Sequence, residues 1–150
     1  MKPLKFLGYL CALLLAVQVV VVLWGVITRY ALGNQAGWTE ELAGYLLIWI
    51  SLMGAAYAVG TRSHIAISLF PDGLPPARRR RVNRIIDGLI LCFAVAVMMV
   101  GGSYYVWLTL SLGQRAPSLQ LPVGLVYLAV PVAGLFVSFF QLKDLIYGRD

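Results

Sequence analysis

The sequence predicts an all-α membrane protein with four transmembrane helices in a single domain. Of its 150 residues, 61% are hydrophobic and 12% are charged, whereas in a soluble domain roughly a quarter of the residues are charged. A bilayer core about 30 Å thick is crossed by roughly 20 apolar helical residues. Four apolar runs of this kind occupy about residues 6–27, 42–59, 85–112 and 122–142.

The first span follows Lys2 and Lys5, as the apolar region of a signal peptide follows its basic residues. Its apolar run is too long for a typical signal peptide, and no clear small-residue cleavage site follows, so we expect an uncleaved transmembrane helix. Gln18 lies near mid-membrane and is expected to bond a neighbouring helix. Cys11 and Cys92 lie in apolar runs, where a thiol usually serves as a small packing residue.

The connector between the first two spans holds the candidate site. Thr39 is predicted to cap the second helix with its hydroxyl. Glu40 and Glu41 then fall in the first turn, where the positive end of the helix dipole favours carboxylates. Tyr30 and Trp38 are the amphipathic rings expected at a membrane–water boundary.

Three interpretations of this connector remain open. It is a capped helix end with an aromatic belt, or Arg29 pairs with Glu40 or Glu41 and pins two helix ends, or the two carboxylates face another protein. Charges at the bilayer boundary are costly to leave unpaired, which favours a defined partner for each of them.

The second span carries small residues four apart on one face: Ser51 with Ala55, and Gly54 with Ala58. Such a face lets another helix approach closely. It serves either the interior of this chain or a second subunit, and the sequence does not separate these two possibilities.

Residues 60–84 form a polar stretch between the second and third spans. Within it, Ile65, Ile67, Leu69 and Phe70 predict a short interfacial segment on the membrane surface. An arginine cluster follows, which is expected to bind anionic lipids and to fix the topology; its members are Arg78, Arg79, Arg80, Arg81 and Arg84. Nucleic acid is not an expected partner in this context.

The last two spans contain packing signals and one charged pair. Asp87 follows Arg84 by three residues, so the two side chains can pair on one helix face. Residues 101–103 make a patch of small side chains in the third span. Pro131 is expected to kink the fourth span.

The distribution of basic residues predicts the orientation. Four spans place both termini and residues 60–84 on one side, with ten lysines and arginines, against Arg29 and Arg115 on the other. The positive-inside rule therefore predicts cytoplasmic termini. The connector and the 113–121 loop are expected to face outward.

No ionisable residue lies in the middle of a span, which argues against a self-sufficient small antiporter, because such carriers usually keep a titrating group in the membrane. That alternative would need Glu40 or Glu41 to couple transport to pH. A second alternative, a membrane anchor for a redox enzyme, predicts cofactor absorbance, although the single His64 excludes bis-histidine haem ligation within the chain. No enzymatic motif is present, so the residues alone favour a scaffold for a partner.

A family resemblance is carried by the run RY…WTEELAGYLLIW…GAAYA…RSHIAI and by SLQLPVGLVYLAVPVAG in the last span. Nearly the whole chain resembles the small membrane subunit (DctQ-like, small permease) of tripartite ATP-independent periplasmic (TRAP) transporters. In that family an Arg-Tyr pair closes helix one and Trp-x-Glu-Glu opens helix two. The matching residues are Arg29, Tyr30, Trp38, Glu40, Glu41, Trp49, Gly54, Ala55, Arg62 and His64.

The resemblance implies a non-catalytic subunit in the cytoplasmic (inner) membrane of a bacterium or archaeon. It would scaffold a large multi-span subunit that carries an organic acid with sodium, and a periplasmic binding protein would deliver the acid. Arg115 is the expected contact with that binding protein. No cofactor, metal or catalytic residue is expected. The expected structural or partner-interface residues are Arg29, Tyr30, Trp38, Glu40, Glu41, Trp49 and His64.

Overall fold

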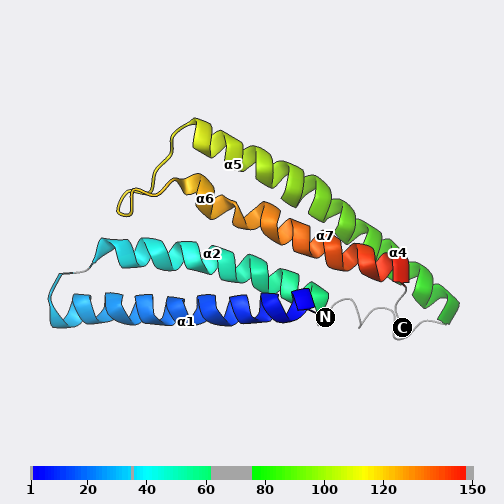
Figure 1. Ribbon diagram of the computed structural model, residues 1–150, viewed down its shortest axis with the longest axis horizontal. Helices are drawn as coiled ribbons and strands as arrows, with labels where there is room; N and C mark the ends of the chain where they lie inside the picture. The colour runs from blue at the N-terminus through cyan, green and yellow to red at the C-terminus, as the bar shows by residue number, and fades with distance from the viewer. Residues whose placement is uncertain (1, 35, 62–75, 148–150) are drawn as a thin grey trace.

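The computed structural model describes residues 2–34, 36–61 and 76–147, and these residues are mainly helical. The predicted interfacial segment, with His64, lies outside the described residues. The elements are α1 (Lys2–Ala31), α2 (Gly37–Gly60), α4 (Pro76–Phe93), the π-helix η1 (Ala94–Gly101), α5 (Gly102–Ser111), α6 (Val123–Tyr127) and α7 (Ala129–Tyr147) (Figure 1).

Four helical stretches of the described chain are long and apolar enough to cross a membrane: Pro3–Ala31, Gly37–Gly60, Arg81–Ser111 and Val123–Ile146. The predicted all-helical chain with four long apolar helices is thereby confirmed. The third stretch begins earlier than residue 85, because helix α4 starts at Pro76, where proline suits the first helical position. Arg78, Arg81 and Arg84 therefore stand exposed on a helix rather than in a loop.

The described helices lie in an open row (Figure 1). α1 packs mainly on α2, α2 packs on α7, and α7 packs on the continuous helix formed by α4, η1 and α5. The beginning of α1 and the end of α7 lie on one side of the molecule, where one set of helix ends is found. The α1–α2 connector and the 112–122 loop lie at the opposite ends of the helices, which we call the connector end.

A core cluster contains residues from all four long apolar stretches. Small side chains let these helices approach closely: a Cβ built on Gly134 would lie 2.8 Å from Met98 Cβ, and one on Gly102 would lie 3.1 Å from Pro131 Cδ. Such contacts between small residues and a facing helix are typical of membrane bundles. The buried members of the cluster are Leu7, Met53, Ala56, Ala94, Ala133, Val137 and Phe140.

Two irregularities interrupt the last two spans. The fourth span breaks at Leu128, between α6 and α7. Pro131 has no amide to donate to the Tyr127 carbonyl one turn earlier, so the break occurs where the sequence predicts a kink. The π-helix η1 in the third span was not predicted, since no proline or polar residue marks it.

The outer faces of the helices remain strongly apolar. Only 6% of the most apolar window of α1 is buried, and Val20 on that helix is 66% exposed. Trp107 on α5 is 63% exposed. A chain with this much uncovered apolar surface needs lipid or protein around it.

Candidate functional site

The α1–α2 junction is built on a close contact between Gly25 and Thr39. A Cβ at Gly25 would lie 2.8 Å from Thr39 Oγ1, and Thr39 is only 2% exposed. The predicted capping role of Thr39 is wrong, because α2 begins at Gly37 and Ala36 occupies the N-cap position. The Thr39 hydroxyl instead donates to the Ala36 carbonyl oxygen at 2.6 Å.

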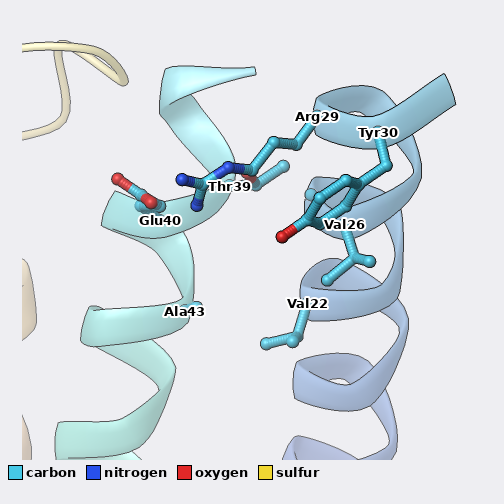
Figure 2. A pocket seen from close by; sticks show the side chains of 8 residues that line it. Val22, Val26, Arg29, Tyr30, Thr39, Glu40 and Ala43 are labelled. Atoms are coloured by element: carbon cyan, nitrogen blue, oxygen red, sulfur yellow. The ribbon is translucent and has the colours of Figure 1, made fainter. Parts of the chain in front are cut away.

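A groove of about 240 Å³ opens beside this contact, between the last two turns of α1 and the first turns of α2 (Figure 2). Its walls are apolar in the deeper part and polar at the connector end. Figure 2 shows the Arg29 side chain extending across the groove toward α2, where Glu40 lies. The groove is lined by Val22, Gly25, Val26, Arg29, Tyr30, Thr39, Glu40 and Ala43.

The orientation of Arg29 bears on the predicted pairing with a carboxylate. Its Cζ lies 5.9 Å from the centroid of the Tyr30 ring, a distance at which a cation–π attraction operates. Both carboxyl oxygens of Glu41 are engaged elsewhere, as described next. Of the two predicted partners, Glu40 is the one toward which Arg29 points (Figure 2).

Glu41 joins α2 to the 112–122 loop. Its Oε2 accepts hydrogen bonds from the backbone amides of Ser118 and Leu119, both at 2.9 Å. Its Oε1 accepts a bond from the Tyr45 hydroxyl at 3.0 Å. Two backbone amides on one carboxylate make a strong, charge-assisted contact. The partners of Glu41 lie 77 and 78 residues away in the chain, and no local sequence pattern indicates them.

The loop held by Glu41 is itself well ordered by backbone bonds. The Ala116 amide donates to the Leu121 carbonyl oxygen, and the Gln120 amide donates to the Ala116 carbonyl oxygen, both at 2.9 Å. Arg115 pairs with Pro122 across the neck of the loop. The Arg115 side chain is exposed, so the loop presents a cation on a fixed frame.

The remaining candidate residues fall in different environments. Tyr30 is 80% exposed and Trp38 is 39% exposed at the connector end. Trp49 instead packs against the core cluster of this chain. His64 and Arg62 lie outside the described residues. The interface roles of all these residues stay predictions.

A buried polar pair joins α4 and α7, away from the connector end. Gln141 Nε2 on α7 donates to Asp87 Oδ1 on α4 at 2.6 Å, and the two residues are 4% and 3% exposed. Sequence reasoning placed Asp87 beside Arg84 on one helix face and missed this contact across helices. The signal that could have found it is the second polar residue, Gln141, in the last apolar span.

The other polar and sulfur-bearing residues of the spans are less engaged. Gln18 Oε1 is buried without a hydrogen-bond partner among the described residues, so this oxygen does not make the predicted helix–helix bond. Cys11 and Cys92 are free thiols. Cys11 packs against the core cluster, as predicted, whereas Cys92 is exposed. No group of three or more possible metal-binding side chains occurs in the part of the chain that the structure describes.

An open row of four helices that are long and apolar enough to cross a membrane defines the class as a small multi-pass membrane protein. The particular family follows from comparison: the model of the DctQ component of tripartite ATP-independent periplasmic transporters matches residues 18–149. The chain belongs to this family. It is therefore a small permease subunit of a TRAP transporter, a transport component and not an enzyme.

Curated relatives agree with this assignment. A Haemophilus influenzae protein described as a TRAP transporter small permease protein is 32% identical over 95% of this chain and 86% of its own length. The sialic acid TRAP transporter small permease protein SiaQ of Vibrio cholerae is 28% identical over 88% of this chain and 75% of its own length. The isethionate TRAP transporter permease protein DctMQ of Oleidesulfovibrio alaskensis is 32% identical over 73% of this chain, and the match spans 17% of that longer protein.

Proposed function

We propose that this chain is the static scaffold of its transporter. It holds the fixed part of a large, multi-span permease subunit in the inner membrane, while that subunit moves an organic acid together with sodium. The DctMQ relative, in which the matching region is a small part of a longer permease protein, supports a tight association between the two kinds of subunit.

The observation that carries this proposal is the uncovered small-residue face of α2. Ser51 and Ala55 are exposed, and a Cβ built on Gly54 would meet nothing within 4 Å. In the last two spans, in contrast, Gly102 and Gly134 are buried against facing side chains of the same chain. A second subunit is the natural partner for a face that lets a helix approach closely and that the described chain leaves open.

The connector end is the proposed contact with a periplasmic binding protein. Arg115 stands exposed on a loop that Glu41 and the backbone bonds hold in place. This proposal requires the termini to be cytoplasmic and the connector end to face the periplasm, as the distribution of basic residues predicts. The cargo is proposed to be an organic acid, because relatives are named for sialic acid and isethionate.

Co-purification tests the scaffold function. The tagged chain, expressed with its neighbouring membrane genes and extracted in mild detergent, should carry a large multi-span protein in a one-to-one complex. Gly54→Leu should reduce that recovery severalfold and leave the fold of the isolated chain unchanged, because Gly54 has open space around it. A matched variant, Val20→Leu on the outer face of α1, should have little effect.

Two other outcomes would overturn the scaffold function. If the chain runs alone as a homo-oligomer and transports substrate in liposomes, it is a self-sufficient carrier. If it co-purifies with a redox enzyme and cofactor absorbance, it is a membrane anchor.

A further inference from the structure

The groove at the connector end has the dimensions and chemistry of a lipid site. Its volume of about 240 Å³ lies below the roughly 300–1,000 Å³ of pockets that enclose a drug-sized ligand. It is an open groove between α1 and α2 (Figure 2). A narrow open groove of this kind suits a stretch of an extended chain better than a compact solute.

The small residues of the junction create the groove. At its floor, Gly25 and Thr39 are in close contact, and the Thr39 hydroxyl is satisfied within its own helix. Ala43 continues the α2 wall, and its methyl group leaves the space unfilled. On α1, Val22 and Val26 form the opposite wall and remain 44% and 47% exposed. The side walls of the deeper part of the groove are therefore apolar, and Thr39 is the one polar residue at its floor.

The polar end of the groove is expected at the depth of lipid headgroups, because it lies at the end of an apolar helix. Arg29 and Tyr30 are in the last turn of α1, which ends at Ala31. Val26 and Val22 lie about one and two helical turns deeper. An acyl chain that follows the two valines would thus bring its phosphate near the Arg29 guanidinium, which extends over the groove (Figure 2).

Glu40 sets the type of headgroup. It lines the same polar end, across the groove from Arg29 (Figure 2). A carboxylate repels an anionic headgroup but accepts an ammonium, and its two oxygens offer about four acceptor positions, so other contacts need not be given up. A headgroup with a phosphate and a primary ammonium complements the Arg29 and Glu40 charges together.

We propose that the α1–α2 groove binds one phosphatidylethanolamine molecule of the leaflet at the connector end, with its phosphate at Arg29, its ammonium at Glu40 and an acyl chain along Val22, Val26 and Ala43. The identification of this leaflet as the periplasmic one rests on the topology proposed above; the site itself does not. The lipid would bind Arg29 and Glu40 in addition to the contacts that these residues make within the chain.

Native mass spectrometry of the full chain tests the site. The protein is equilibrated in detergent with phosphatidylethanolamine or with phosphatidylglycerol, and the lipid that survives removal of loosely bound molecules is counted. The wild type should retain one phosphatidylethanolamine per chain and prefer it to phosphatidylglycerol. Arg29→Gln should lower retention of both lipids by about tenfold or more, as expected for a lost charge-assisted contact, and Arg29→Lys should restore part of it.

Two further variants separate the parts of the site. Glu40→Gln should abolish the preference for phosphatidylethanolamine while lipid is still retained. Ala43→Phe should expel the lipid with both charges intact, because its ring fills the groove. The matched controls are Arg115→Gln, an exposed cation outside the groove, and Val20→Phe on the opposite face of α1; both should behave as the wild type.

Cross-linking in the assembled transporter distinguishes a lipid from a covering protein. A photoreactive amino acid in place of Val26 should give an adduct with the mass of a phospholipid. An adduct with the large subunit, or no lipid adduct, would overturn the proposal. The proposal would also be overturned if Arg29→Gln and Ala43→Phe retained as much lipid as the wild type. It would likewise be overturned if Arg115→Gln lost as much lipid as Arg29→Gln.

Discussion

Glu41 acts at the residue scale as the link between α2 and the 112–122 loop. Glu41→Ala removes the acceptor of the Ser118 and Leu119 amides and of the Tyr45 hydroxyl. Hydrogen exchange at Ser118 and Leu119 should then accelerate by roughly tenfold or more, because both amides lose a charged acceptor. Exchange measured by mass spectrometry on loop peptides checks this.

Tyr45→Phe is the matched control for that experiment. It removes only the hydroxyl that donates to Glu41 Oε1 and leaves both loop amides bonded. Its effect on exchange of the loop should be small. Equal exchange in Glu41→Ala and in the wild type would show that the loop holds its shape through its own backbone bonds alone.

The Asp87–Gln141 pair makes a prediction about buried polar groups. Asp87→Leu leaves the Gln141 amide buried without this acceptor, which should cost about 1–3 kcal/mol of stability. The double variant Asp87→Leu with Gln141→Leu should recover most of that loss, since replacing both partners by apolar groups can be nearly neutral. A double-mutant cycle of thermal unfolding in detergent measures the coupling. Additive losses would contradict a direct interaction.

Sequence reasoning at this scale missed partners that are distant in the chain, and it also misassigned one local feature, the cap of α2. Tyr30 and Trp38 are exposed at the connector end, and their place at a membrane–water boundary stays a prediction. Thr39 was predicted to be the N-cap, but α2 already begins at Gly37. Ala36 is therefore the N-cap, and Thr39 is a buried side chain in the first turn of the helix. The Glu41 and Asp87 contacts cross 77 and 54 residues of chain, so only the packing of whole helices determines them.

Glycines decide how the individual helices pack. A Cβ on Gly134 would lie 2.8 Å from Met98 Cβ and 3.3 Å from the Ala94 carbonyl oxygen, whereas one on Gly88 would meet nothing within 4 Å. Gly134→Ala should therefore force α7 away from η1 and lower the stability by about 1–3 kcal/mol. Gly88→Ala should be neutral or stabilising by about 0.5–1 kcal/mol, because alanine favours a helix interior. Thermal unfolding of the two variants in the same detergent checks the difference in sign.

The elements themselves were largely predictable because length and hydropathy determine them. The four apolar helices appear where continuous apolar runs occur, and the break at Leu128 lies one turn before Pro131. The π-helix η1 falls in the apolar run Ala94–Gly101, whose residues fit an α-helix equally well. η1 packs on α7, and such a contact cannot be derived from the third span alone.

At the scale of the whole molecule, some apolar faces are covered by other helices of the same chain and others are exposed. Gly102 and Gly134 in the third and fourth spans serve internal packing, whereas Ser51 and Ala55 on α2 remain exposed. The sequence could not separate these two uses, because small residues four apart look alike in both. In the open row, α2 packs on α1 along one side and on α7 along another, and Ser51 and Ala55 stay exposed within the described chain. That a second subunit covers them stays a proposal.

Orientation in the membrane is the last prediction at this scale. Ten basic residues belong to the end that holds the termini and two to the connector end, so the connector end should be periplasmic. In a variant with Cys11 and Cys92 replaced by alanine, cysteines at Asn34 and Gln114 should react with a membrane-impermeant maleimide in intact cells. A cysteine at Ile146, which is 67% exposed near the end of α7, should react only after the membrane is opened. Labelling of Ile146→Cys in intact cells would show the opposite orientation. Arg115 would then face the cytoplasm, and the proposed contact with a periplasmic binding protein would be ruled out.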